Sequence, residues 1–345
     1  MVFRLAFTPC LAETLTVAVA SHFLLGFPWI WGFMLGFVLA AVSPAVVVPC
    51  LLGLQERGYG VDKGIPTLVI AAASVDDVLA ISGFTILLGI TFKPNQDIIA
   101  IIFQGPKEVA IGLLFGIAWA ILSTLFPGKD DKIMGKLRFG MVFLGGLLAY
   151  FGSKSLQLDG AGALAVLVMA FVAGIGWRKR GWSNENMVTS TLSDLWMIFQ
   201  PILFGLIGTE IRVSELDPET VGYGLAVLAI GLTIRIIVSY LAVLGGDLSM
   251  KERIFVALAW LPKATVQAAL GPVALDSLYN SDLEESSELF QTRKNLGLQV
   301  LTIAVLVILI TAPIGSVAIT LTGPRLLNKK DNTEDNTNKD VEAEA

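Results

Sequence analysis

Apolar residues fall along this chain in long, nearly uninterrupted runs that are separated by short polar stretches. Ten runs are long enough to cross a bilayer as helices, because about 20 residues rising 1.5 Å each span its hydrocarbon core. The pattern therefore predicts an all-α polytopic membrane protein with about ten transmembrane helices. The predicted segments are 3–25, 29–54, 66–92, 108–126, 139–157, 159–177, 191–210, 219–244, 252–275 and 296–322.

Composition supports the membrane assignment. Of 345 residues, 54% are hydrophobic and 15% charged, and the mean hydropathy is +0.74. Such values are typical of a lipid-embedded protein and favour the bilayer, not nucleic acid, as the partner. The two cysteines, Cys10 and Cys50, lie in apolar segments without metal-ligand spacing, so a disulfide framework is excluded.

Basic residues are unevenly shared between the two sides of the predicted topology. Of the 24 lysines and arginines, two lie inside predicted helices and six on the side opposite the N-terminus, which leaves 16 on the side of the N-terminus. By the positive-inside rule, both termini are expected on the cytoplasmic or matrix side. The polar segment 323–345 is predicted to be a disordered tail.

Two stretches repeat each other at a shift of 218 residues, since 37–48 matches 255–266 with its proline in register. Pro44 and Pro49 are expected to interrupt the first segment, and Pro262 and Pro272 the second, because proline lacks the N–H of a helical hydrogen bond. Two corresponding broken helices indicate an ion site near the middle of the membrane.

The number of crossings between the related segments predicts an inverted repeat. The expected organisation is a first core repeat over 1–92, linking scaffold helices over 93–218, a second core repeat over 219–322 and the tail. The glycine-rich scaffold helices are expected to pack closely.

Asp76 and Asp77 stand side by side within the apolar run 66–92. One aspartate at the centre of a membrane helix costs roughly 2.5 to 3.5 kcal/mol, and two adjacent carboxylates also repel each other. On a helix they point about 100° apart, so one can face a cavity and the other a neighbouring helix. Helix caps are a weaker interpretation, because the apolar run continues on both sides. The pair predicts a transport site.

Three further charges fall within predicted helices. Glu13 and Arg235 lie in equivalent helices and are expected to pair, as a structural latch or as a proton gate. Lys263 follows Pro262 at the predicted break, where it would neutralise helix carbonyls or pair with Asp76 or Asp77. Snorkelling to the interface is the alternative for both cations.

Neutral oxygens accompany these charges at the predicted breaks. Ser43, Ser74, Thr265 and Gln267 offer hydroxyl and amide oxygens suited to a partly dehydrated hard cation. His22, the single histidine, is interpreted as an interfacial residue.

Several motifs resemble those of a known family. They are Val-Ser-Pro-Ala-Val-Val-Val-Pro (42–49), Gly-Tyr-Gly-Val with Gly-Ile-Pro-Thr (58–67), Ala-Ser-Val-Asp-Asp-Val-Leu-Ala-Ile (73–81), Phe-Gln-Pro-Ile-Leu-Phe-Gly-Leu-Ile-Gly (199–208) and Ala-Leu-Ala-Trp-Leu-Pro-Lys-Ala-Thr-Val-Gln-Ala-Ala-Leu-Gly-Pro (257–272). They resemble the sodium/hydrogen antiporters of the cation:proton antiporter 2 class, in the animal NHA branch (solute carrier family 9, subfamily B). The resemblance extends from residue 1 to about 325.

This resemblance implies exchange of Na⁺ or Li⁺ for H⁺ by alternating access, in a homodimer and without a cofactor. It places cation and proton binding on Asp77 with Asp76 beside it, supported by Lys263, Glu13 and Arg235. The plasma membrane, endosomes, the mitochondrial inner membrane and the sperm flagellum are all compatible with it. Family members carry more helices before the position of Glu13, so a short or incomplete form is expected here.

Three other functions compete with antiport. The first is a non-transporting short isoform or regulatory subunit of a full-length antiporter. The second is an intramembrane aspartyl hydrolase, which is disfavoured because its two carboxylates stand on facing helices and share a proton, whereas Asp76 and Asp77 are consecutive. The third is a passive cation channel.

Overall fold

The computed structural model describes residues 1–92, 98–126, 133–156, 158–182, 187–209, 218–281 and 283–329. Nearly all of these residues are helical. The helices are α1 (Val2–Leu25), α2 (Trp29–Ala40), α3 (Pro44–Glu56), α4 (Ile65–Phe92), α5 (Ile98–Leu125), α6 (Met134–Ser155), α7 (Asp159–Lys179), α8 (Met187–Thr209), α9 (Pro218–Ala242), α10 (Met250–Ala259), α11 (Thr265–Leu270), α12 (Val273–Tyr279) and α13 (Glu288–Leu326).

Within the described ranges, eight helical stretches are long and apolar enough to cross a membrane, α2 and α3 together forming one of them. The all-α polytopic membrane fold is therefore confirmed. Two of the ten predicted spans fall outside this set. Helix α8 carries polar residues through its first turns, and the predicted span 252–275 is divided between α10, α11 and the start of α12.

The chain forms two compact units, one of residues 1–80 with 215–345 and one of residues 81–214. The predicted boundaries of the two repeats and the scaffold remain predictions. The predicted start of the tail was wrong, because α13 remains helical as far as Leu326. The tail residues 330–345 lie outside the described residues.

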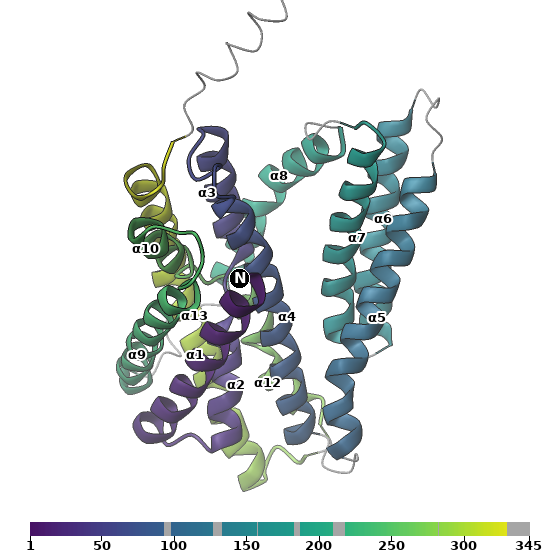
Figure 1. Ribbon diagram of the computed structural model, residues 1–345. Helices are drawn as coiled ribbons and strands as arrows, with labels where there is room; N and C mark the ends of the chain where they lie inside the picture. The colour runs from purple at the N-terminus through teal and green to yellow at the C-terminus, as the bar shows by residue number, and fades with distance from the viewer. Residues whose placement is uncertain are drawn as a thin grey trace, which may run out of the picture. The chain divides into compact units, whose positions relative to one another are not determined.

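In the first unit, α1 packs against both α2 and α9 (Figure 1). A glycine on each neighbour permits close approach: a Cβ on Gly36 would lie 2.6 Å from the Thr14 carbonyl oxygen, and one on Gly231 2.9 Å from Val17 Cγ2. This packing buries one face of α1, the face that carries Glu13.

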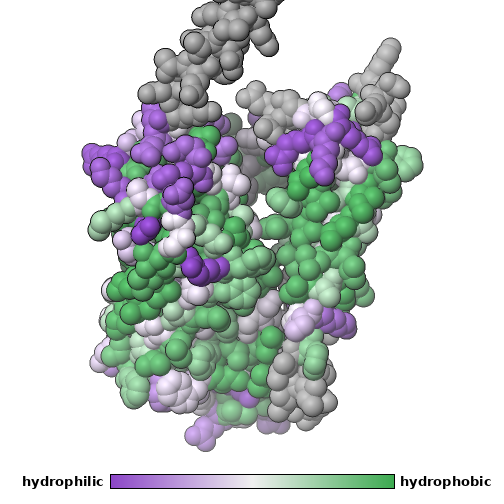
Figure 2. Space-filling view, in the orientation of Figure 1, coloured by the Kyte–Doolittle hydropathy of each residue, from purple (hydrophilic) through white to green (hydrophobic). Residues whose placement is uncertain are grey.

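In the second unit, α5, α6 and α7 run side by side (Figure 1). A Cβ on Gly112 would lie 2.7 Å from the Ala161 carbonyl oxygen, and one on Gly116 2.7 Å from that of Ala165. Small residues bring these helices close together, as expected for the scaffold. Figure 2 shows an apolar surface along these helices with hydrophilic residues gathered near their ends, the distribution that a bilayer requires.

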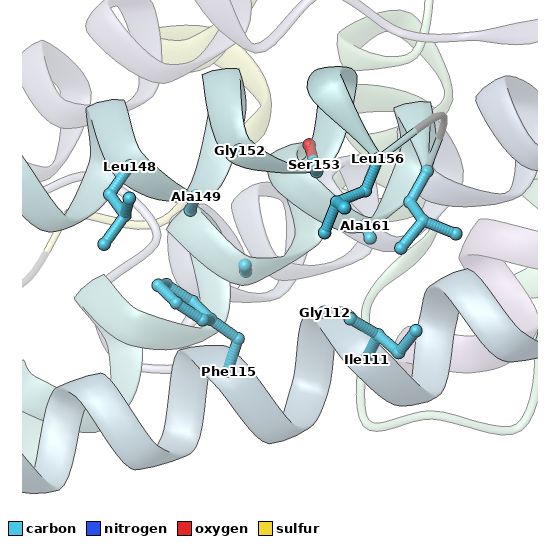
Figure 3. Close-up of a pocket in the computed structure, with 11 residues that line it drawn as sticks. Ile111, Gly112, Phe115, Leu148, Ala149, Gly152, Ser153, Leu156 and Ala161 are labelled. Atoms are coloured by element: carbon cyan, nitrogen blue, oxygen red, sulfur yellow. The ribbon is translucent and has the colours of Figure 1, made fainter.

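A cavity of about 230 Å³ lies among α5, α6 and α7. Figure 3 shows Phe115 from α5 and Leu148 and Ala149 from α6 along it, and Ser153 carries the only hydroxyl among the described lining residues. Such an apolar lining offers too few oxygens to replace the hydration shell of an ion, so this cavity is not a candidate ion site.

In the first unit, a polar clasp joins three chain segments. The buried Glu252 carboxylate accepts hydrogen bonds from Lys63 Nζ at 2.9 Å, Ser249 N at 2.6 Å and Asn328 Nδ2 at 3.4 Å. Ser249 Oγ in turn accepts from the Glu252 backbone N–H, which completes a capping box at the start of α10. The hydrogen bond to Glu252 raises the pKa of the Lys63 ammonium above its usual value. The clasp therefore fixes the N-terminal end of α10.

We expect Glu252→Ala to lower the midpoint of thermal unfolding by about 2–4 °C, because loss of a helix cap costs about 1 kcal/mol. Glu252→Gln should lose less, since its amide oxygen still accepts from Ser249 N. Lys251→Ala, a change at the exposed neighbouring lysine, is the control and should leave the midpoint unchanged. Melting curves of the purified protein in detergent measure all three, and equal midpoints for Glu252→Ala and Lys251→Ala would contradict this role of the clasp.

Candidate functional site

The two predicted helix breaks are present, and they touch each other. Helix α2 ends at Ala40 and α3 begins at Pro44, while α10 ends at Ala259 and α11 begins at Thr265. The Ser43 backbone N–H donates to the Pro262 carbonyl at 2.8 Å, and Ser43 Oγ lies 3.4 Å from Thr265 Oγ1. The unwound segments therefore lie side by side within the first unit.

At the first break, backbone donors leave their helical partners. In a continuous helix, Val42 N–H would donate to the Val38 carbonyl and Ser43 N–H to that of Leu39. Here Val42 N–H donates to Asp76 Oδ2 at 3.0 Å, and Ser43 N–H to Pro262. Both donors therefore bind groups outside their own helix.

Side chains at the second break and in the first turn of α11 bind carbonyls at the first break. Gln267 Nε2 donates to the Val38 and Ala41 carbonyls, at 2.9 Å each, and Lys263 Nζ donates to the Leu39 carbonyl. An unpaired backbone group in the membrane interior costs several kcal/mol, and these exchanged hydrogen bonds remove that penalty.

Four fully buried charges surround the two adjacent breaks: Glu13, Asp76, Arg235 and Lys263. Arg235 donates to Glu13 Oε2 at 2.5 Å, to Asp76 Oδ2 at 2.9 Å and to the Trp260 carbonyl at 3.1 Å. Lys263 Nζ lies 2.9 Å from Glu13 Oε2. Two carboxylates and two cations thus form one balanced network, which buried charges require.

The structure confirms some predicted contacts and corrects others. Glu13 and Arg235 pair as expected, and their burial excludes snorkelling for Arg235 and Lys263. Lys263 does bind a helix carbonyl. Its predicted pairing with Asp76 or Asp77 was wrong, because Arg235 occupies the paired oxygen of Asp76 and Lys263 pairs with Glu13 instead. The Arg235–Asp76 pair was not predicted, since no sequence pattern relates those two positions.

The two adjacent aspartates differ in their contacts. Asp76 is fully buried and ion-paired. Asp77 is partly exposed and makes no hydrogen bond or ion pair within the described part of the chain, although its Oδ1 is buried. Asp76 therefore faces a neighbouring helix, as expected of one of the two carboxylates, and the expectation that the other, Asp77, faces a cavity stays a prediction.

The remaining predicted site residues have other surroundings. Ser74 Oγ donates to the Ile70 carbonyl of its own helix. Pro44 begins α3, whereas Pro49 lies inside α3 without ending it, so its predicted role as an interruption was wrong. Pro272 precedes α12, and His22 stacks on Trp29 with a ring-centroid distance of 4.1 Å.

Several buried oxygens at the site lack a hydrogen-bond donor among the described residues: Asp76 Oδ1, Asp77 Oδ1, Glu13 Oε1 and Gln267 Oε1. Oxygen acceptors without donors suit a hard cation or water. The described chain contains no group of three His, Cys, Asp or Glu side chains able to hold a metal ion.

Comparisons with known proteins identify the family and relatives of the chain. The family model for the transmembrane region of sodium/hydrogen exchangers matches residues 1–323. The chain is 49% identical over 331 residues to sodium/hydrogen exchanger 9B2 of Xenopus tropicalis, covering 95% of this chain and 59% of that protein. It is 48% identical over 342 residues to human sodium/hydrogen exchanger 9B2, covering 99% and 60%, and 44% identical over 329 residues to human sodium/hydrogen exchanger 9B1, covering 95% and 61%.

The chain thus spans about three fifths of the length of these relatives. Among solved structures, the sodium proton antiporter MjNhaP1 from Methanocaldococcus jannaschii at pH 8 is similar, with a TM-score of 0.71 at 19% identity, over 94% of this chain and 78% of that one. This similarity concerns the fold. The match over residues 1–323 shows that the chain belongs to the sodium/hydrogen exchanger family.

Proposed function

We propose that this chain exchanges Na⁺ or Li⁺ for H⁺ across a membrane by alternating access, with Asp77 binding the cation and the proton in turn. The observation that carries the proposal is the difference in contacts between the two aspartates beside the two adjacent breaks. Asp76 is held by Arg235 and Val42, whereas the Asp77 carboxylate has no partner within the described residues. Membership of the exchanger family and the antiporter fold support it.

Charge balance explains how one carboxylate couples two ions. Glu13 and Asp76 offset Arg235 and Lys263, so Asp77 is the one charge at the site that has no counter-charge among the described residues. Either a proton or a monovalent cation neutralises it, and each excludes the other. Moving a bare carboxylate through a low-dielectric barrier is costly. The site therefore switches from one side of the membrane to the other when Asp77 carries a proton or a cation, and not when Asp77 is unoccupied. The proposed exchange is one cation for one proton.

The network around Arg235 acts in this proposal as a fixed support. Glu13, Arg235 and Lys263 join α1, α9 and the second break, and their net charge of +1 balances the Asp76 carboxylate next to Asp77. The second oxygen of that carboxylate, Asp76 Oδ1, has no donor among the described residues and is available to a cation bound at Asp77. We therefore favour the structural latch over the proton gate for the Glu13–Arg235 pair.

The protein is an integral membrane protein. We propose further that both termini face the cytoplasm or matrix and that the chain works as a homodimer, as the uneven distribution of basic residues and the family resemblance imply. The non-transporting short isoform or regulatory subunit, the hydrolase and the channel are not favoured, because the exchanger family and the antiporter fold support antiport.

We expect Asp77→Asn to abolish exchange, because an amide cannot alternate between proton and cation. The measurement uses liposomes with a luminal pH dye and a Na⁺, Li⁺ or K⁺ gradient imposed outside. Na⁺ and Li⁺ should drive proton movement in the unchanged chain, and Asp77→Asn should give the signal of empty liposomes. Asp62→Asn, at an exposed loop carboxylate, should remain active. Full activity of folded Asp77→Asn would refute the assignment.

We expect Arg235→Gln to destabilise the fold strongly, since removing one partner of a buried ion pair costs about 3–5 kcal/mol. The double variant Arg235→Gln/Asp76→Asn removes one uncompensated carboxylate as well and should recover part of the loss. Arg57→Gln, at an exposed arginine, should melt like the unchanged protein. Thermal unfolding in detergent compares the variants, and a double variant no more stable than Arg235→Gln would contradict the charge balance.

A further inference from the structure

We propose that Gln267 is a positioning residue for the ion site: its amide holds the first helix break open and so keeps Asp76 in place beside Asp77. The proposal rests on the proposed function of Asp77. Its starting point is that the fully buried Gln267 side chain donates to two backbone carbonyls of the other break. It thus acts as a donor, in addition to offering an oxygen.

The orientation of the Gln267 amide follows from its neighbours. Val38 O and Ala41 O are both acceptors, and only the NH₂ group of an amide can donate to two acceptors at once. The amide oxygen then faces away from them and has no donor among the described residues. A glutamine rotated by half a turn would oppose oxygen to oxygen at two contacts.

One peptide group connects Gln267 with Asp76. The Ala41 carbonyl and the Val42 N–H belong to the same planar peptide unit, so they point in opposite directions and move together. The carbonyl accepts from Gln267 Nε2 at 2.9 Å, and the N–H donates to Asp76 Oδ2 at 3.0 Å. Rotation of this peptide would break both hydrogen bonds.

The second contact of Gln267 protects the same hydrogen bond. Val38 O is the acceptor that Val42 N–H would have in a continuous helix. While Gln267 occupies Val38 O, the Val42 N–H remains on Asp76. Gln267 thus occupies the competing acceptor, Val38 O, and holds the peptide group that carries the Val42 N–H.

Loss of Gln267 leaves two interior carbonyls without donors. Val38 O can then compete with Asp76 for the Val42 N–H, because that N–H is its partner in a continuous helix. The Ala41 carbonyl recruits water, and the segment around Val42 loosens. Asp76 loses its backbone donor, and the position of Asp77 becomes less defined.

The test compares Gln267→Leu with Gln291→Leu. Gln291 is an exposed glutamine whose Nε2 also donates to a backbone carbonyl, that of Glu285, so the control loses the same kind of hydrogen bond elsewhere. We expect Gln267→Leu to raise the apparent KM for Na⁺ about tenfold with kcat changed less than about threefold, as loss of one hydrogen bond in the bound state predicts. Gln291→Leu should leave both constants unchanged.

A second readout does not depend on transport. Hydrogen–deuterium exchange of peptides containing Val42 and Ser43 should be about tenfold faster in Gln267→Leu than in the unchanged protein, and unaltered in Gln291→Leu. If the unchanged chain shows no antiport, the proposed function fails, and the exchange rates alone decide on Gln267. Unchanged exchange together with an unchanged KM would overturn the positioning role.

Gln267→Glu supplies a conservative variant in case the leucine variant does not fold. A protonated glutamic acid can donate to one of the two carbonyls, whereas a carboxylate can donate to neither and is repelled by both. The measured quantity is the ratio of the KM for Na⁺ of Gln267→Glu to that of the unchanged protein at the same pH. We expect this ratio to be about fivefold smaller at pH 6 than at pH 8.5. A ratio independent of pH would overturn the proposed donor role.

Discussion

The structure depends on one buried guanidinium. Arg235 binds a carboxylate of α1 through Glu13 and a carboxylate of α4 through Asp76, and Lys263 from the second break shares the Glu13 oxygen. None of these charges can be removed alone without leaving an uncompensated charge in the membrane interior. The network therefore ties α1, α4, α9 and the break after α10 into one unit, and every other feature of the site is arranged around that constraint.

The two adjacent breaks show how a membrane protein can interrupt a helix in the membrane interior. Four backbone groups released at the first break are paired by residues at or just after the second: Ser43 by Pro262, Leu39 by Lys263, and Val38 and Ala41 by Gln267. Val42 binds Asp76 instead. Because these pairs cross between distant parts of the chain, the break and the charge network stabilise each other. A rigid pair of breaks of this kind can hold the Asp77 carboxylate in place through its neighbour Asp76, without a hydrogen bond to Asp77 itself.

Two neighbouring aspartates thus acquire different chemistry from the same helix. The rotation of about 100° between consecutive residues turns Asp76 toward Arg235 and leaves Asp77 without a partner among the described residues. The ion-paired carboxylate and the proposed exchange site are one residue apart. The apolar cavity among α5, α6 and α7 has no comparable set of oxygens, in keeping with a scaffold role for that unit.

The sequence by itself determined the membrane class, most of the spans, the positions of both breaks and the charged residues of the site, because hydrophobic length, proline and the high cost of buried charge act locally. It also predicted the Glu13–Arg235 pair, through the repeat. Only the tertiary structure decided that Lys263 pairs with Glu13, that Arg235 also holds Asp76, that Pro49 does not end α3 and that Gln267 donates to the opposite break. The physical reason is that several cations and carboxylates of similar strength were available, and their pairing depends on distances between helices that lie far apart in the chain.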